Sequence, residues 1–162
     1  FISFILIPLI IVKIKFYNKA EPFGENFNNL FTSKNNKKLA MEIGKAINVI
    51  PQALDEFDCN NDYDVVFFGA GIYGGTVAPD VLSKLSSWNN AHIGKVILYS
   101  ANGFGRNQYQ SLIDILRGNN IEVEQNIYVC VGQAFFFKNH GRPNAQDCEA
   151  AGRFAQEMLK NI

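Results

Sequence analysis

Short apolar runs alternate along most of the chain with segments whose apolar residues recur at helical spacing. The runs at residues 65–68 (VVFF) and 96–99 (VILY) suit strands that are buried on both faces of a parallel sheet. A further short strand is expected at residues 49–51, and an interrupted one at residues 121–131. Four segments predict amphipathic helices: residues 37–47, 79–85, 108–117 and 144–159. This alternation predicts an α/β fold of βαβ units, with helices on both faces of a parallel sheet.

Residues at the predicted helix ends support these assignments. Asn36 can cap the first helix, and Pro79 suits the first position of the second. Gly118 is a natural stop for the third helix. Asn144 and Asp147 form a capping-box pattern at the start of the last helix, with Asp in place of the usual Glu or Gln.

The first 30 residues depart from this alternation. Residues 1–12 are almost wholly apolar, but a bilayer span needs about 20 apolar residues. One interpretation is that residues 1–12 are the end of a truncated anchor or signal segment, which would place them in contact with a membrane. This interpretation is the less favoured one. The β-branched residues favour a strand at residues 5–17, followed by a polar loop or insertion. We therefore divide the chain into an atypical segment, residues 1–30, and a domain, residues 31–162.

Composition narrows the function classes. A length of 162 residues predicts one domain, and the 15 basic and 15 acidic residues cancel. No basic stripe points to nucleic acid, so no nucleic-acid partner is expected. Three widely spaced cysteines are typical of reduced thiols in a cytoplasmic protein, and two histidines are too few for a histidine-based metal centre. We predict no metal site.

Residues 64–75, DVVFFGAGIYGG, are the most informative stretch. A loop this rich in glycine lets the backbone approach a flat or anionic ligand. It would lie at the carboxyl end of a central strand, where open α/β sheets bind their ligands. A tight turn without any ligand is the alternative.

The same glycines match the dinucleotide pattern G-x-G-x-x-G at Gly69, Gly71 and Gly74. That pattern needs a helix opening directly from the loop and an acidic residue about 20 residues further on. Here the next helix is expected to start late, at Pro79, and residues 81–113 contain no Asp or Glu. The nicotinamide interpretation is therefore disfavoured.

No grouping at readable spacing predicts covalent or acid–base catalysis. Asp55, Glu56 and Asp58 cluster, but a solvated loop explains them better. We predict no catalytic residue, and whether the chain is an enzyme stays open. The aromatic run at residues 135–137 is expected to be exposed or half-buried, and core packing under a loop is the alternative and the commoner setting for such residues.

Three segments in order resemble the flavodoxin-like family. YDVVFFGAGIYGGTVAPDVLSKL is similar to that family's third strand, flavin loop and following helix. KVILYSANG is similar to its fourth strand and next flavin loop, and GRPNAQDCEAAGRFAQEML to the Pro-Asn-x-x-Asp opening of its last helix. The resemblance covers residues 31–162. It implies a three-layer, doubly wound, five-stranded parallel sheet of order 2-1-3-4-5 that binds FMN at its switch point.

The resemblance also implies the cofactor-binding residues. The family's phosphate loop corresponds to residues 31–36, where Lys34 replaces a glycine and Asn36 a threonine. Tyr73 would stack on the flavin ring or cover one face, and Asn102 would offer an amide to its pyrimidine side. The expected set is Ser33, Lys34, Asn35, Asn36, Ala70, Gly71, Ile72, Tyr73, Gly74, Gly75, Ser100, Ala101, Asn102 and Gly103.

Two functions follow from the resemblance. The first is an FMN-binding redox protein, either an electron carrier or a small flavin-dependent oxidoreductase. In it the flavin would carry the redox chemistry. The protein would exchange electrons with a redox partner protein or a small-molecule acceptor. The second is a flavodoxin-like module that has lost FMN and acts through protein contacts. Lys34 favours it, as does the poor strand character of residues 26–30, which come just before the phosphate loop.

Overall fold

The computed structural model describes residues 34–162. The predicted strand at residues 5–17, the division at residue 30 and the candidate Ser33 lie outside the described residues. The elements follow in the order α1 (Lys34–Ile47), the 3₁₀ turn η1 (Leu54–Glu56), β1 (Tyr63–Phe68), β2 (Ile72–Tyr73), β3 (Thr76–Val77), α2 (Pro79–Leu85), β4 (Ile93–Asn102), α3 (Gln110–Gly118), β5 (Glu122–Val123), β6 (Tyr128–Val131) and α4 (Ala145–Lys160).

A parallel sheet forms the centre of the molecule, as the buried apolar runs predict. β1 pairs with β4, and β4 pairs on its other side with β5 near its start and with β6 near its end. β5 and β6 together make up the predicted strand at residues 121–131, and the polar residues 124–126 interrupt it. At residues 49–51 only Val49 makes a bridge. The described part of the sheet therefore has the order β1–β4–β5/β6, and the full five-strand order 2-1-3-4-5 is not confirmed.

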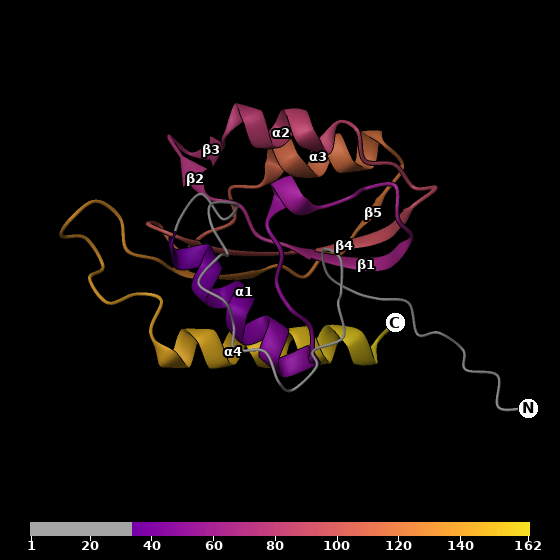
Figure 1. Cartoon of the computed structure of the whole chain (residues 1–162). Coiled ribbons are helices and arrows are strands. Elements are labelled where there is room, and N and C mark those ends of the chain that lie inside the picture. Colours follow the sequence, from indigo (N-terminus) through magenta and orange to yellow (C-terminus); the bar gives the residue numbers. More distant parts are fainter. Residues whose placement is uncertain (1–33) are drawn as a thin grey trace, which may run out of the picture.

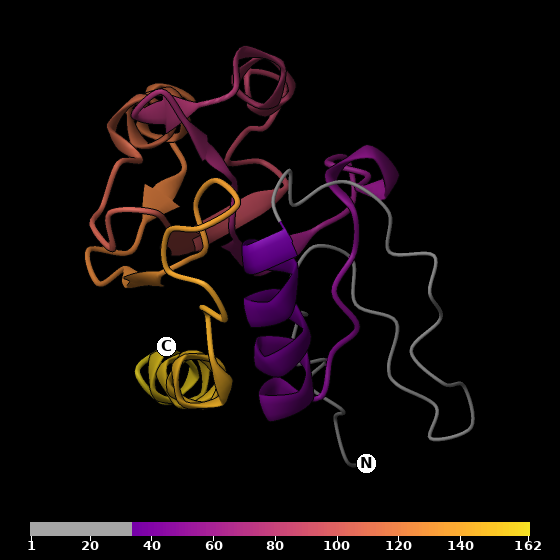
Figure 2. The same cartoon turned by 90° about the vertical axis from the view of Figure 1, so that its left-hand side faces the viewer.

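Helices cover both faces of this sheet. α2 and α3 lie on one face, and α1 and α4 lie side by side on the other (Figures 1 and 2). The run from Val65 to Phe68 is buried between these two helix layers, as are Ile97 and Leu98 of β4. Because β1, β4 and β6 run parallel, their carboxyl ends lie at the same edge of the sheet.

The helix ends show which local rules decided the boundaries. α2 begins at Pro79 and ends at Leu85, as predicted. The capping box at Asn144 and Asp147 is present in both directions. α1 begins at Lys34, three residues earlier than predicted, so Asn36 lies inside the helix and does not cap it. In the part of the chain that the structure describes, no helix is long and apolar enough to cross a membrane.

Candidate functional site

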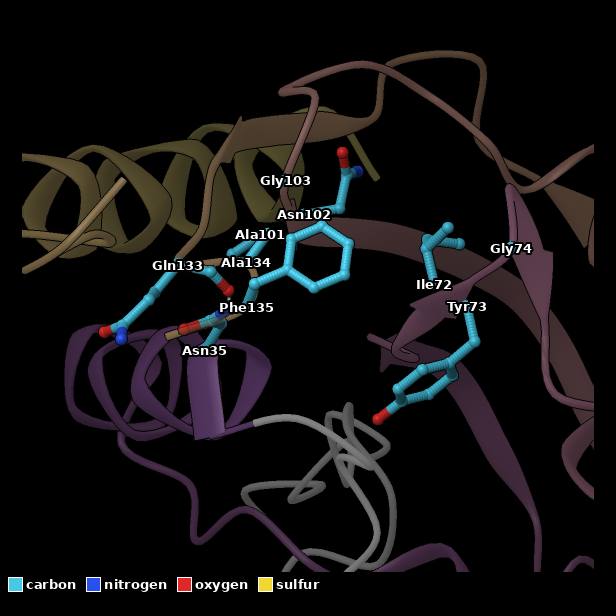
Figure 3. A pocket seen from close by; sticks show the side chains of 10 residues that line it. All are labelled: Asn35, Ile72, Tyr73, Gly74, Ala101, Asn102, Gly103, Gln133, Ala134 and Phe135. Carbon is cyan, nitrogen blue, oxygen red and sulfur yellow. Dashed lines mark hydrogen bonds between the residues drawn. The ribbon is translucent and has the colours of Figure 1, made fainter. Parts of the chain in front are cut away.

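A cleft of about 350 Å³ lies at the carboxyl ends of the parallel strands. The loops that follow β1, β4 and β6 line it together with the first turn of α1 (Figure 3). This is the position in which open α/β sheets bind ligands. The lining residues are Asn35, Ile72, Tyr73, Gly74, Ala101, Asn102, Gly103, Gln133, Ala134 and Phe135.

Seven of these ten residues are among the predicted cofactor-binding residues, and three are not. Gln133, Ala134 and Phe135 follow β6, which pairs with the end of β4 and so delivers its loop to the same edge. The rule that parallel strands end at one edge could have found them, because the interrupted strand at residues 121–131 was recognised. The resemblance pointed to residues 31–36 and to the loops after β1 and β4, and not to the loop after β6.

The structure gives Asn36 a different role from the predicted phosphate contact. Its side chain is fully buried, its Nδ2 donates to the carbonyl of Ala70 (3.1 Å), and its Oδ1 accepts from the Ala101 amide (2.9 Å). It thus ties α1 to the loops after β1 and β4, underneath the cleft. Lys34 is exposed and is the first residue of α1, so it belongs to a helix where the family's loop has a glycine.

The loop after β1 is fixed from below by Tyr109, which the sequence did not single out for this site. Its buried hydroxyl accepts from the Ala70 amide (2.8 Å) and lies within donating distance of the carbonyls of Ala70 (2.6 Å) and Tyr99 (2.8 Å). Burial raises the pKa of Tyr109 to about 12, so the hydroxyl keeps its proton. Ala70 therefore has a fixed position, although it does not itself line the cleft.

The glycines of this loop serve packing and turn geometry. A Cβ at Gly69 would overlap the Tyr99 ring, and Gly71 is buried. Gly74 and Gly75 form the turn of the β2–β3 hairpin with φ of 59° and 86°, which explains the choice of glycine at both positions without a ligand. The hairpin separates β1 from α2, which agrees with the argument against a dinucleotide loop.

The polar side chains after β4 are used within their own loop. Asn102 Nδ2 donates to Ser100 Oγ (3.0 Å) and to the Arg106 carbonyl (2.8 Å), and its Oδ1 accepts from the Phe104 amide (3.1 Å). Both protons of this amide are therefore occupied, and it does not offer a donor to the cleft as expected. Ser100 is fully buried. Of this segment, only residues 101–103 line the cleft.

Two aromatic side chains flank the cleft. Phe135 projects into it from the loop after β6, and Tyr73 lies on the opposite side on the β2–β3 hairpin (Figure 3). Phe135, Phe136 and Phe137 are largely exposed, so the run is an exposed one and the alternative of core packing under a loop is wrong. The loop is a small hairpin closed by the bridge between Ala134 and Lys138. It presents Phe136 and Phe137 to solvent, while Phe135 also reaches the cleft.

The described residues contain no grouping for metal binding, and burial makes two of the thiols unreactive. No set of three or more His, Cys, Asp or Glu among residues 34–162 could hold a metal ion. All three cysteines are free. Burial raises the pKa of Cys130 to about 11 and also raises that of Cys148, which leaves both as unreactive thiols.

Comparisons with known proteins agree with this arrangement. No family model matches the chain. An uncharacterized protein of Methanocaldococcus jannaschii is 29% identical, and the match covers 79% of this chain and 92% of that protein. Among solved structures, a flavodoxin from the domain Archaea matches with a TM-score of 0.60 and 15% identity, over 80% of this chain and 91% of its own. The fold is flavodoxin-like. At this identity the likeness to the archaeal flavodoxin carries the fold alone, and the ligand has to be argued from the cleft.

Proposed function

We propose that this flavodoxin-like chain binds FMN in the cleft and acts as a redox protein, either an electron carrier or a small flavin-dependent oxidoreductase. The observation that carries the proposal is the shape and lining of the cleft. Two aromatic residues, Tyr73 and Phe135, flank a slot at the carboxyl ends of the parallel strands, and Ile72, Ala101 and Ala134 supply further apolar surface. A flat ring system of moderate polarity suits such walls.

The residues present fit the two ends of FMN to different degrees. For the phosphate, α1 offers the backbone amides of its first turn, with no acidic residue in that turn and with Lys34 at its start. A helix N-terminus of this kind favours an anion. For the ring, the chain offers aromatic and aliphatic surface, together with the side chains of Asn35 and Gln133 at the rim.

Bound flavin would supply the electron-transfer chemistry, and the chain would set its position and exposure. Asn36 and Tyr109 hold the loops after β1 and β4 at a fixed separation. Tyr73 and Phe135 would exclude water from the two faces of the ring. Because both are partly exposed, one edge of the ring would stay open to an electron donor or acceptor.

Titration of the purified chain with FMN tests this proposal. Quenched flavin emission and a Kd below about 1 μM, which corresponds to about −8 kcal/mol, is the expected result. Phe135→Ala should weaken binding by roughly fivefold or more because it removes one wall, while Phe136→Ala is a matched control that leaves the cleft unchanged. Riboflavin, which lacks the phosphate, should bind more weakly than FMN if α1 holds that group.

The alternative is a module that has lost FMN and acts through protein contacts. The internal use of the Asn36 and Asn102 amides favours it, because neither can serve a ligand. Absence of binding at high micromolar FMN, in a chain whose circular dichroism shows it to be folded, would support this second function and reject the first.

A further inference from the structure

The loop between β6 and α4 presents three consecutive phenylalanines beside the cleft. Phe135, Phe136 and Phe137 are 79%, 96% and 82% exposed, and Phe104 in the neighbouring loop is 63% exposed. The rings of Phe135 and Phe137 stack on each other, with centroids 6.3 Å apart. The loop extends away from the sheet and helices (Figure 1). Large apolar side chains gathered on a protrusion mark a surface that contacts another body.

The backbone builds this exposure into the loop. The Ala134 amide donates to the Lys138 carbonyl (2.9 Å), and the Lys138 amide donates back (3.1 Å). Asn139 Nδ2 donates to the carbonyls of Gly103 (3.0 Å) and Gly132 (3.2 Å). Phe135 and Asn139 have φ of 57° and 56°, a region that residues other than glycine rarely adopt. Such strain persists only where the surrounding bonds fix it, so the outward direction of the rings is specified by the fold.

The charged side chains in the loops that carry these rings are all basic. The loops at residues 103–108 and 132–143 contain Arg106, Lys138 and Arg142 and no Asp or Glu. Lys138 Nζ lies 4.3 Å and Arg106 Cζ 5.1 Å from the centroid of the Phe104 ring. Among the described residues, only Arg142 of these three cations has a carboxylate partner. We call Phe104, Arg106 and residues 135–138 the aromatic tip.

We propose that the aromatic tip docks on the surface of an anionic lipid membrane. The interfacial region of a bilayer receives aromatic side chains to a depth of about 5–10 Å, and its anionic headgroups attract Lys and Arg. A protruding tip needs no matching hollow in such a surface, whereas a protein partner would need a pocket for three rings. The competing occupant is an acidic protein with an apolar pocket.

Docking in this way has a geometric consequence for the cleft. Phe135 belongs both to the tip and to the cleft wall, so contact through the tip brings the open side of the cleft to the bilayer. The docking itself rests on the loop alone and does not depend on FMN binding. Its test can therefore fail or succeed independently of the flavin titration.

Vesicle sedimentation of the full chain tests the docking. The wild type should bind vesicles of phosphatidylcholine with phosphatidylglycerol, bind vesicles of phosphatidylcholine alone more weakly, and lose affinity between about 0.1 M and about 0.5 M salt. The double variant Phe136→Ser, Phe137→Ser should bind anionic vesicles at least about tenfold more weakly. Ile162→Ser, which removes an exposed apolar side chain at the end of the chain remote from the tip, is the matched control and should bind like the wild type.

Tryptophan emission locates the contact and still applies if the double variant does not fold. The single native tryptophan, Trp88, is buried and gives a constant background. Emission from a Phe136→Trp chain should shift to the blue on addition of anionic vesicles, and emission from an Ile162→Trp chain should not.

Three results would overturn the proposal. One is a wild type that ignores both kinds of vesicle, which would leave an acidic protein as the occupant. Another is unchanged binding by the folded double variant, which would place the contact elsewhere in the chain. The third is sedimentation of the Phe136→Trp chain with vesicles but without a blue shift.

Discussion

Replacement of Asn36 by leucine tests how the cleft is held together. Asn36 is fully buried, and among the described residues its side chain bonds to the Ala70 carbonyl in the loop after β1 and to the Ala101 amide at the end of β4. Leucine has the same branching and the same number of heavy atoms, but no polar atom. It leaves the Ala101 amide without this acceptor in a buried place, which costs about 1–3 kcal/mol. The Ala70 carbonyl still accepts from Tyr109, so losing its second bond costs only about 1 kcal/mol.

The two losses add to about 2–4 kcal/mol, and the apolar burial of leucine offsets part of this sum. We therefore expect Asn36→Leu to lower the free energy of unfolding by about 2 kcal/mol. Urea denaturation measures this as a midpoint about 1 M lower with an unchanged slope, because that slope is about 1–3 kcal/mol/M for domains of this size.

The neighbouring residue provides the matched control. Asn35 is half-buried and donates one side-chain bond, to the Gln133 carbonyl (2.8 Å). Asn35→Ala should therefore cost no more than about 1.5 kcal/mol. Equal losses for the two variants, or a loss below about 1 kcal/mol for Asn36→Leu, would refute the assignment of Asn36 as the tie between the loops.

Three further substitutions check other parts of the argument. Tyr109→Phe leaves the Ala70 amide without its partner and should lower the free energy of unfolding by about 1–3 kcal/mol, measured in urea; a loss below about 0.5 kcal/mol would count against this contact. Gly69→Ala forces a methyl group into a neighbouring tyrosine ring and should lower the melting temperature by several degrees in a thermal scan, at about 1–3 kcal/mol. Burial alone would raise the pKa of Asp147, but hydrogen bonds from the Arg142 side chain and the Asn144 backbone lower it overall. The ionised carboxylate therefore stabilises the fold at a pH above its unfolded pKa of about 4, and this stabilisation is lost as the pH falls through the lower folded pKa. The stability difference between wild type and Asp147→Asn should thus be largest near pH 7 and shrink toward about pH 2, and a difference independent of pH would contradict the ion pair.

Much of the fold could be predicted because its determinants are local. The short apolar run closed by Gly69 suits a strand buried on both faces, and Pro79 set the start of α2 through its fixed φ. The capping box at Asn144 set the start of α4 through bonds that span three residues. The order of strands and helices then restricted the topology to a parallel sheet between helix layers.

The candidate site was predictable only in part. The sequence pointed to the loops after β1 and β4, because glycine and the end of an apolar run are visible along the chain. It could not show that Asn36 faces inward, because its direction depends on α1 packing beneath loops that are 34 and 65 residues away in the sequence. The same holds for Tyr109, whose hydroxyl meets Ala70 across 39 residues.

By itself, then, the sequence determined the α/β class, the bounds of α2 and the start of α4, because each depends on hydrophobic periodicity or on bonds between near neighbours. Only the tertiary structure decided which polar side chains support the cleft and which line it. It also decided that Phe135 stands at the rim of the cleft and that residues 136 and 137 face solvent, since a run of phenylalanines has the same pattern in a core as on a tip. The hairpin closed by Ala134 and Lys138 makes that choice, through backbone bonds and a positive φ that periodicity does not encode.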